Sequence, residues 1–183
     1  TSSRRQRQMC IRDRVIGDGQ KEATTIGPLI DSNAAEDVKN LIEDAKIKGA
    51  RVELGGDTCD LGDNFVHPTI LSNINTSMRV FNEEIFGPVA PIIKFETENE
   101  AIELANQTDF GLAAYFYSRD VGRVYRVSEK LEFGIIGVNE GIISNEMAPF
   151  GGIKESGNGR EGSKYGLDDY LEIKYVCVGG INE

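Results

Sequence analysis

The stretch of sequence that decides the fold runs from Phe133 to Val178 and reads FGIIGVNEGIISNEMAPFGGIKESGNGREGSKYGLDDYLEIKYVCV. It begins with a short apolar strand over 134–138, continues through a polar loop and a glycine-dense region, and closes on the alternating pattern of 171–178. This alternation predicts a strand with one apolar face. Because the strand follows a long excursion, we expect it to pair with the open sheet edge of another subunit and to serve oligomerisation.

Ahead of that stretch, helix and strand signals alternate from Val15 onward. Apolar residues spaced as on one helical face predict a helix; Asp31, Ser32 and Asn33 offer side-chain caps at its start, and Gly49 is a natural stop. Thr97 and Glu100 have the spacing of a capping box and predict a second helix. A third helix is expected from about Ser118 to Leu131. The strands predicted between and around these helices are 51–54, 65–71, 89–95, 112–117 and 134–138.

Strands that alternate with helices through short links predict an α/β fold, with a mostly parallel sheet and flanking helices. The unbroken apolar run LAAYFY (112–117) predicts a strand buried on both faces. Prolines 68 and 91 mark irregular or edge positions within two of the other strands.

Composition narrows the class of protein. A formal net charge of −10 argues against nucleic-acid binding, and no apolar run approaches the roughly 18 residues of a membrane span. Three cysteines are too few and too scattered for a disulfide framework or a metal site, so we expect no metal and a reducing, intracellular setting. The cytoplasm is the expected compartment, with mitochondria as the alternative.

The first fourteen residues, TSSRRQRQMCIRDR, hold five arginines against one acid. Arginine- and serine-rich starts occur in transit peptides, but this one also looks like translated sequencing-adapter DNA. We interpret residues 1–14 as a non-native leader. The predicted organisation is then a partial catalytic domain over 15–170 and an oligomerisation strand with its tail over 171–183.

Several motifs and residues are of types found in catalytic or binding sites, but the sequence around them does not support such a role. GNGREG (157–162) matches the dinucleotide fingerprint, but neither an apolar strand before it nor a periodic helix after it is predicted, so we interpret it as packed turns. Cys10, Cys59 and Cys177 lie in no electropositive pocket that the sequence predicts, and none is expected to be a nucleophile. His67, the only histidine, precedes a proline and is not expected to be catalytic.

The segment NEEIFGPVAPI (82–92) is the first that suits a ligand. Gly87-Pro88 fixes a turn and leaves Glu84 and Phe86 at a spacing of two, so that both can face one side. A carboxylate can accept hydrogen bonds from vicinal hydroxyls, and an aromatic ring can pack on a flat heterocycle. From spacing alone, a solvated glutamate beside a core phenylalanine is the more ordinary interpretation.

Three motifs in order reverse that preference: TIGPLID (25–31), NEEIFGPVAPI (82–92) and PFGG (149–152). From about residue 15 to the end, the chain resembles the aldehyde dehydrogenase superfamily, and the wording of 133–178 is most similar to the succinate-semialdehyde dehydrogenases. The resemblance implies that Glu84 holds the nicotinamide ribose of NAD or NADP and that Phe86 lies against the nicotinamide ring. It leaves open which of the two nucleotides is used.

The loop NEGIISNEMAPFGG bears on substrate choice. In the superfamily this loop lines the aldehyde tunnel, and in succinate-semialdehyde dehydrogenases the serine of such a G-I-I-S loop donates to the distal carboxylate of the substrate. The resemblance therefore implies that Ser144 binds substrate and that Phe150 forms a wall of the tunnel. A hydroxyl leaves room for a charged oxygen, whereas an aromatic side chain would desolvate it. For these residues alone, a loop-capping serine and a core phenylalanine are the alternatives.

The family mechanism uses a cysteine thiolate, hydride transfer to NAD(P)+ and hydrolysis of a thioester. The motif of its nucleophile, and the general-base glutamate, have no counterpart in residues 1–183, so no catalytic residue is assigned. We therefore expect a C-terminal fragment, inactive alone, of an NAD(P)+-dependent, homo-oligomeric succinate-semialdehyde dehydrogenase. A glutarate-semialdehyde or other aldehyde dehydrogenase, or a non-catalytic interaction module, is the alternative.

Overall fold

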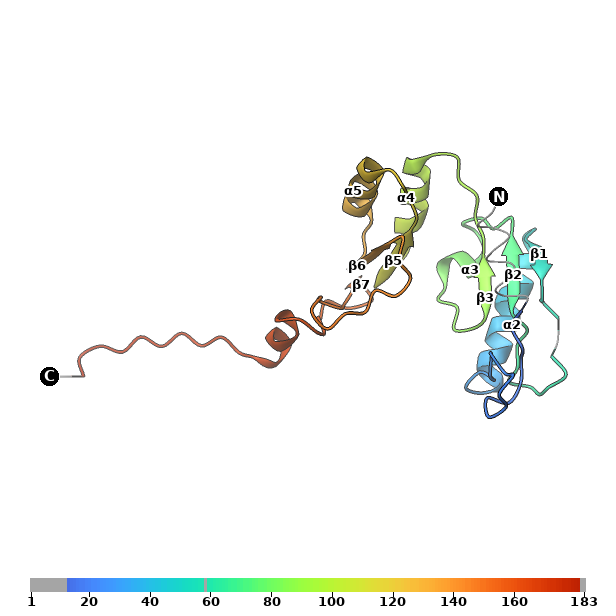
Figure 1. Ribbon diagram of the computed structural model, residues 1–183, viewed down its shortest axis with the longest axis horizontal. Helices are drawn as coiled ribbons and strands as arrows, with labels where there is room; N and C mark the ends of the chain where they lie inside the picture. The colour runs from blue at the N-terminus through green and yellow to red at the C-terminus, as the bar shows by residue number, and fades with distance from the viewer. Residues whose placement is uncertain (1–12, 58, 182–183) are drawn as a thin grey trace. The chain divides into compact units, whose positions relative to one another are not determined.

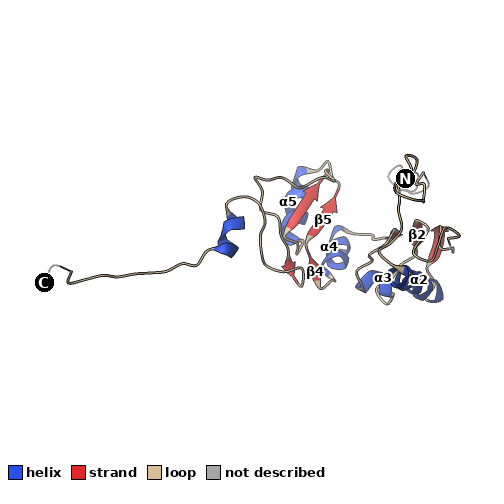
Figure 2. Ribbon diagram, turned by 90° about the horizontal axis from the view of Figure 1, so that it is seen from below, coloured by secondary structure: helices blue, strands red, loops and turns tan. Residues whose placement is uncertain are grey.

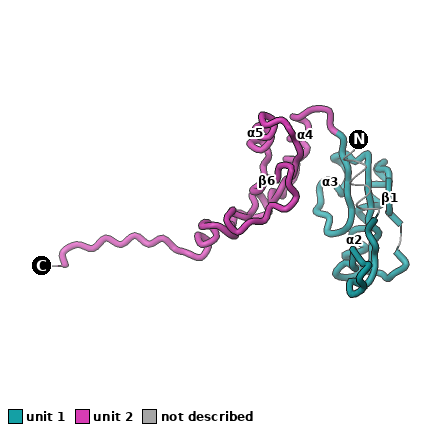
Figure 3. Tube along the Cα trace, in the orientation of Figure 1, with its two compact units in different colours: residues 1–94 teal, residues 95–183 magenta. Residues whose placement is uncertain are grey.

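The computed structural model describes residues 13–57 and 59–181, and the chain divides into two compact units. Unit 1 ends at Lys94 and unit 2 begins at Phe95 (Figure 3). Most of the predicted leader, with Cys10, lies outside the described residues. None of the described helices has both the length and the apolar stretch that a bilayer crossing needs.

Unit 1 combines a long helix with a small sheet (Figure 1). Helix α2 (Ser32–Ile47) begins where the Asp31 side chain accepts a hydrogen bond from the Ala34 N–H, as the sequence predicts. It ends before Gly49, whose φ of +95° is a backbone conformation that suits glycine. The other elements are β1 (Arg51–Leu54), β2 (Thr69–Ser72), the short helix α3 (Arg79–Asn82) and β3 (Val89–Pro91).

The core of unit 1 lies between α2, the sheet and the segment that leads into α3. It is a continuous cluster of buried side chains, in which Leu71 and Met78 are fully enclosed. Its members are Ala35, Val38, Leu41, Ile42, Ala45, Val66, Leu71, Ile74, Met78 and Val80. The apolar face predicted for α2 is therefore confirmed, because five of its residues enter this cluster.

The sheet of unit 1 has the order β1-β2-β3, with β1 and β2 antiparallel and β2 and β3 parallel. The predicted strands 65–71 and 89–95 are shorter in the structure, since regular pairing starts after Pro68 and stops at Pro91. Proline has no N–H to donate to a ladder, which explains both limits. The turns of 55–68 bring the chain straight back, so β1 and β2 form an antiparallel pair without a crossover helix.

Unit 2 begins with helix α4 (Glu98–Asn106), opened by the predicted capping box. The Thr97 hydroxyl accepts from the Glu100 N–H, while the Glu100 carboxylate accepts from the Thr97 N–H. Strand β5 (Ala113–Phe116), helix α5 (Val121–Lys130) and strand β6 (Ile135–Val138) follow, and β5 pairs with β6 in parallel. This strand–helix–strand unit confirms one predicted crossover (Figure 2).

The described strands do not confirm the predicted mostly parallel sheet, because two of the four strand pairs are parallel and two are antiparallel. They form three small sheets, and β4 (Phe110–Gly111) and β7 (Ile153–Lys154) are antiparallel, as β1 and β2 are. The run 112–117 is also not buried on both faces, because Tyr115 and Tyr117 are exposed. The apolar run identified a strand correctly, but the number of its covered faces depends on neighbours that no local pattern specifies.

The C-terminal part of unit 2 is largely unpaired. A six-residue 3₁₀ helix, Tyr165–Tyr170, is followed by residues 171–181, which are exposed and form no ladder with any described residue (Figure 2). The predicted strand over 171–178 therefore has no partner within this chain. Its role in oligomerisation stays a prediction.

Candidate functional site

Glu84 and Phe86 lie in the segment of unit 1 that joins α3 to β3. The neighbouring Glu83 is engaged in a two-pronged ion pair, in which Arg79 Nε and Nη2 lie 2.6 and 2.8 Å from its two carboxylate oxygens. The hydrogen bond from Arg79 lowers the pKa of Glu83 below its ordinary value. Glu84, in contrast, makes no hydrogen bond or ion pair with any described residue, and it is exposed.

Phe86 presents its ring outward, with 75% of the side chain exposed. An isolated exposed phenylalanine is not unusual, but this one lies two residues after the unengaged carboxylate of Glu84. Gly87 fixes the segment to the core, because a Cβ there would stand 2.6 Å from the Val38 side chain. The resemblance implies that this open carboxylate and aromatic ring hold the ribose–nicotinamide end of a dinucleotide, and that role stays a prediction.

Ser144 lies in a loop that leaves the carboxyl end of β6. The loop begins at Asn139, whose side chain bridges to the end of β5: its Oδ1 accepts from the Ser118 N–H at 2.9 Å and its Nδ2 donates to the Ser118 carbonyl at 2.7 Å. Next, the Glu140 carboxylate accepts from the N–H groups of Ile142 and Gly141, which lowers its pKa. The first bend of the loop is thereby fixed by its own side chains.

The other end of the loop is fixed at Phe150, which exchanges two backbone hydrogen bonds with Glu161, of 2.8 and 2.7 Å. Between the two ends, the Asn145 side chain accepts from the Met147 N–H, and the Ser163 N–H donates to the Glu146 carbonyl at 2.9 Å. Ser144 itself is exposed and its hydroxyl makes no hydrogen bond within the described residues. We call residues 139–150 the substrate loop, after the role that the resemblance implies for them.

Phe150 is half-buried and lines a hollow of about 580 Å³ together with Leu112, Arg160 and Tyr170. The role that the resemblance implies for Phe150, as a wall of the substrate tunnel, stays a prediction. Thus Ser144 and Phe150 belong to one loop of unit 2, and Glu84 and Phe86 to one segment of unit 1. Ser144 is not among the residues that line the hollow at Phe150.

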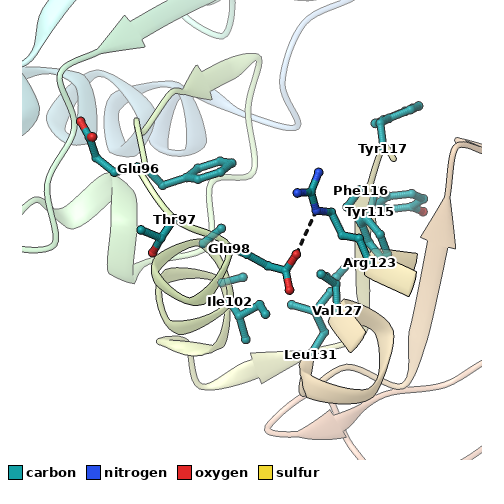
Figure 4. A pocket seen from close by; sticks show the side chains of 14 residues that line it. Glu96, Thr97, Glu98, Ile102, Tyr115, Phe116, Tyr117, Arg123, Val127 and Leu131 are labelled. Atoms are coloured by element: carbon teal, nitrogen blue, oxygen red, sulfur yellow. Dashed lines mark hydrogen bonds and ion pairs between the residues drawn. The ribbon is translucent and has the colours of Figure 1, made fainter. Parts of the chain in front are cut away.

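A second hollow in unit 2, of about 440 Å³, contains none of the four predicted residues. It lies against α4, α5 and β5, with Ile102, Val127 and Leu131 on its apolar side (Figure 4). Glu98 receives hydrogen bonds from Arg126 and Arg123, and these bonds lower the pKa of its carboxyl group. The ion pairs engage Glu98 and Arg123 at this hollow, and nothing in it resembles an acid–base pair.

The structure also describes the glycine-rich motif and two of the three cysteines. GNGREG follows the two-residue β7 and leads into bends, with Gly157 and Gly162 at positive φ, which confirms the turn interpretation. Cys59 and Cys177 are free thiols, and no group of three or more metal-ligating side chains exists in the described residues. No nucleophile or general base emerges from the described part of the chain.

The sequence did not single out three residues that shape the substrate loop: Ser118, Asn139 and Arg160. Asn139 has a φ of +56°, and an asparagine at the end of a strand is a usable signal for such a turn. Arg160 stands inside GNGREG, where its charge among glycines was the only hint. Ser118 left no signal, because its contribution is a backbone amide.

Comparison with known proteins gives a consistent family. The family model described as "Aldehyde dehydrogenase family" matches residues 8–176. The succinate-semialdehyde dehydrogenase [NADP(+)] GabD of Escherichia coli is 59% identical over 164 residues, which are 90% of this chain and 34% of that protein. The 3-sulfolactaldehyde dehydrogenase of Pseudomonas putida is 57% identical over 167 residues, covering 91% of this chain and 34% of that protein.

A solved structure supports the same family. The succinate-semialdehyde dehydrogenase from Burkholderia pseudomallei is 52% identical, with a TM-score of 0.89, covering 93% of this chain and 35% of that one. The chain therefore has the mixed α/β fold of its matches and belongs to the aldehyde dehydrogenase family. It spans about a third of the length of the curated relatives that it matches.

Proposed function

We propose that the chain is the C-terminal part of an NAD(P)+-dependent succinate-semialdehyde dehydrogenase. In this proposal the enzyme oxidises a short aldehyde with a distal carboxylate to the dicarboxylic acid, through a thioester on a cysteine outside residues 1–183. Relatives with that name at 54–59% identity support it. The single observation that carries it is the exposed, unbonded hydroxyl of Ser144 on a loop fixed at both ends.

The geometry accounts for the chemistry of recognition. A serine hydroxyl that donates to no protein group is free to donate to a carboxylate oxygen, and the fixed ends of the loop lower the entropy cost of holding it in place. Phe150 would close one side of the tunnel. Glu84 would accept hydrogen bonds from the hydroxyls of the nicotinamide ribose, and Phe86 would pack on the ring. The cofactor, NAD or NADP, supplies the hydride acceptor when it is bound.

The test exchanges Ser144→Ala in the full-length enzyme, with Ser128→Ala on α5 as the matched control. Loss of a hydrogen bond to a charged group predicts a decrease of about tenfold or more in kcat/KM for succinate semialdehyde. An uncharged aldehyde of the same length should lose far less, and the control variant should leave both unchanged. Equal losses for the two aldehydes would remove Ser144 from carboxylate recognition.

The cofactor half of the proposal has its own test. Glu84→Gln keeps the shape of the side chain but weakens its acceptor strength toward ribose hydroxyls, so it should raise the KM for the cofactor and slow the transfer step. Glu83→Gln is the neighbouring control, because Glu83 is bound to Arg79. Unchanged cofactor kinetics in Glu84→Gln would contradict the assignment. The 183-residue chain alone should show no aldehyde oxidation.

One comparison favours a second substrate. The relative from Pseudomonas putida is named for 3-sulfolactaldehyde, whose distal group is a sulfonate. A sulfonate, like a carboxylate, accepts a hydrogen bond from a serine hydroxyl. The ratio of kcat/KM for succinate semialdehyde and 3-sulfolactaldehyde separates the two proposals. A preference for the sulfonate would replace the succinate-semialdehyde assignment.

The proposal also includes a homo-oligomer, in which residues 171–178 form the oligomerisation strand.

A further inference from the structure

The glycine-rich region after the substrate loop packs unusually closely on the loop's C-terminal end. A Cβ on Gly134 would collide with the Gly151 carbonyl oxygen, and a Cβ on Gly151 would collide with the Gly159 carbonyl oxygen. Three backbone segments therefore touch here with no side chain between them: the entry to β6, the PFGG turn and the start of residues 159–163. We call residues 159–163 the clamp segment.

Arg160 is the one long side chain at this contact. Its Nη1 lies 2.7 Å from the Gly152 carbonyl oxygen, 3.0 Å from that of Asn158 and 2.9 Å from that of Gly159. A charged donor shared among carbonyl oxygens gives stronger bonds than a neutral one. Its own backbone N–H donates to the Asp169 carboxylate at 3.2 Å, which ties the clamp segment to the 3₁₀ helix.

The clamp segment continues directly into the bonds that hold the substrate loop. Glu161, the next residue, exchanges two backbone hydrogen bonds with Phe150, and Ser163 donates to the Glu146 carbonyl. Glu146 is two residues from Ser144. Arg160 therefore holds the Gly152 side of the PFGG turn through its side chain, while the next residue, Glu161, holds the Phe150 side through backbone hydrogen bonds.

We propose that Arg160 is a positioning residue for substrate recognition: it holds the clamp segment against Gly152 and thereby sets the substrate loop in the conformation that presents Ser144 and Phe150. Arg160 does not touch the substrate in this proposal. It rests on the proposed function of the loop, but its structural step can be measured independently of any substrate.

The structural step is tested by amide hydrogen exchange in the 183-residue chain. Arg160→Met removes the guanidinium and keeps an apolar stem, and it should speed exchange at Phe150, Glu161 and Ser163 by about tenfold. Arg160→Lys should give a smaller change, because it keeps a charged donor whose single nitrogen carries three N–H groups. Arg119→Met makes the same charge change at an exposed position of unit 2 and should alter none of these amides.

The functional step is tested by kinetics of the full-length enzyme with the same three variants. Arg160→Met should raise the KM for succinate semialdehyde about tenfold while kcat changes less than about threefold, and the KM for an uncharged aldehyde should change little. Arg160→Lys should recover part of the loss. If Arg160→Met unfolds the protein, Arg160→Lys supplies both readouts.

Two results overturn the proposal: unchanged exchange at Phe150 and Ser163 in Arg160→Met, or faster exchange with equal kinetic losses for the two aldehydes. A failure of the proposed function looks different. In that case Ser144→Ala already shows equal losses with intact Arg160, while the exchange experiment still reports whether the clamp holds the loop.

Discussion

Unit 1 and unit 2 have comparable lengths but bury very different amounts of apolar side chain. Of the thirteen buried hydrophobic residues in the described part of the chain, eleven belong to unit 1, and only Ile102 and Val127 belong to unit 2. Unit 2 instead exposes aromatic and aliphatic side chains such as Tyr115, Tyr125 and Ile173. Unit 1 thus has a core of its own, whereas unit 2 offers surface that further protein can cover.

This difference fits a chain that spans a third of the length of its relatives. A unit whose hydrophobic contacts are complete depends little on other parts of a protein. A unit with short strands, two buried hydrophobic side chains and an unpaired tail depends on them more. The following experiments test whether the contrast is energetic as well as geometric, and they begin with the largest expected effect.

Truncation of the unit 1 core should have the largest effect. Leu71→Ala removes a side chain that is 0% exposed, and substitutions of this kind cost about 2–5 kcal/mol of unfolding free energy. Hydrogen exchange at the amides of α2 and β2 measures the loss within the unit. Tyr125→Ala, an exposed control on α5, should stay within about 0.5 kcal/mol. Equal costs for both variants would contradict the contrast between the units.

Loss of a helix cap should have an intermediate effect. Thr97→Ala removes the acceptor for the Glu100 N–H and should destabilise α4 by about 1 kcal/mol. Asp31→Ala makes the corresponding change at α2. Because unit 2 has fewer core contacts to hold a frayed helix, exchange should accelerate further along α4 than along α2. The contrast would be weakened if fraying in both helices stopped within the first turn.

Acid should destabilise the α4–α5 contact. Hydrogen bonds from Arg126 and Arg123 lower the folded-state pKa of Glu98 below the ordinary 4.5 of a glutamate. The resulting stabilisation is present above pH 4.5 and is lost as the pH falls through the lowered value. Urea unfolding followed from pH 6 to pH 3 measures it, and Glu98→Gln should flatten the part of the profile that belongs to unit 2. An unchanged profile would remove this ion pair from the stability of the unit.

The smallest effect is expected in the tail. Ile173 is 100% exposed, so Ile173→Asp should change the unfolding free energy of the chain by less than about 0.5 kcal/mol. In the full-length enzyme the same change should weaken self-association, because it places a charge on the apolar face of the proposed oligomerisation strand. Sedimentation velocity measures the assembly. A tail variant that destabilises unit 2 but leaves assembly intact would reverse this interpretation.

Local signals explain which parts of the fold the sequence predicted. The cap at Asp31, the capping box at Thr97 and the stop at Gly49 depend on residues within one turn, and all three occur as predicted. Strand pairing depends on distant neighbours. The antiparallel partners of β1 and β4, and the exposure of Tyr115, were therefore beyond what a local pattern specifies.

The sequence likewise predicted some residues of the candidate site and missed another. Glu84, Phe86, Ser144 and Phe150 were named from motifs, and the structure describes them as an open segment and a fixed loop; their roles stay predictions. Arg160 was overlooked because its bonds go to carbonyl oxygens of glycine and asparagine residues, which look the same in every sequence. Every residue has a backbone carbonyl, so the sequence does not show which of them will accept a hydrogen bond from a side chain.

The double attachment of residues 139–150 also concerns how such an enzyme changes over generations. Ser118 and Glu161 hold the loop's ends largely through backbone groups, so the anchoring tolerates replacement of the side chains in between. The side chains of the loop can therefore be replaced while its backbone attachments are kept. Insertions and deletions, by contrast, would change the length of chain between the two attachment points, so we expect them to be poorly tolerated here even though the loop lies on the surface.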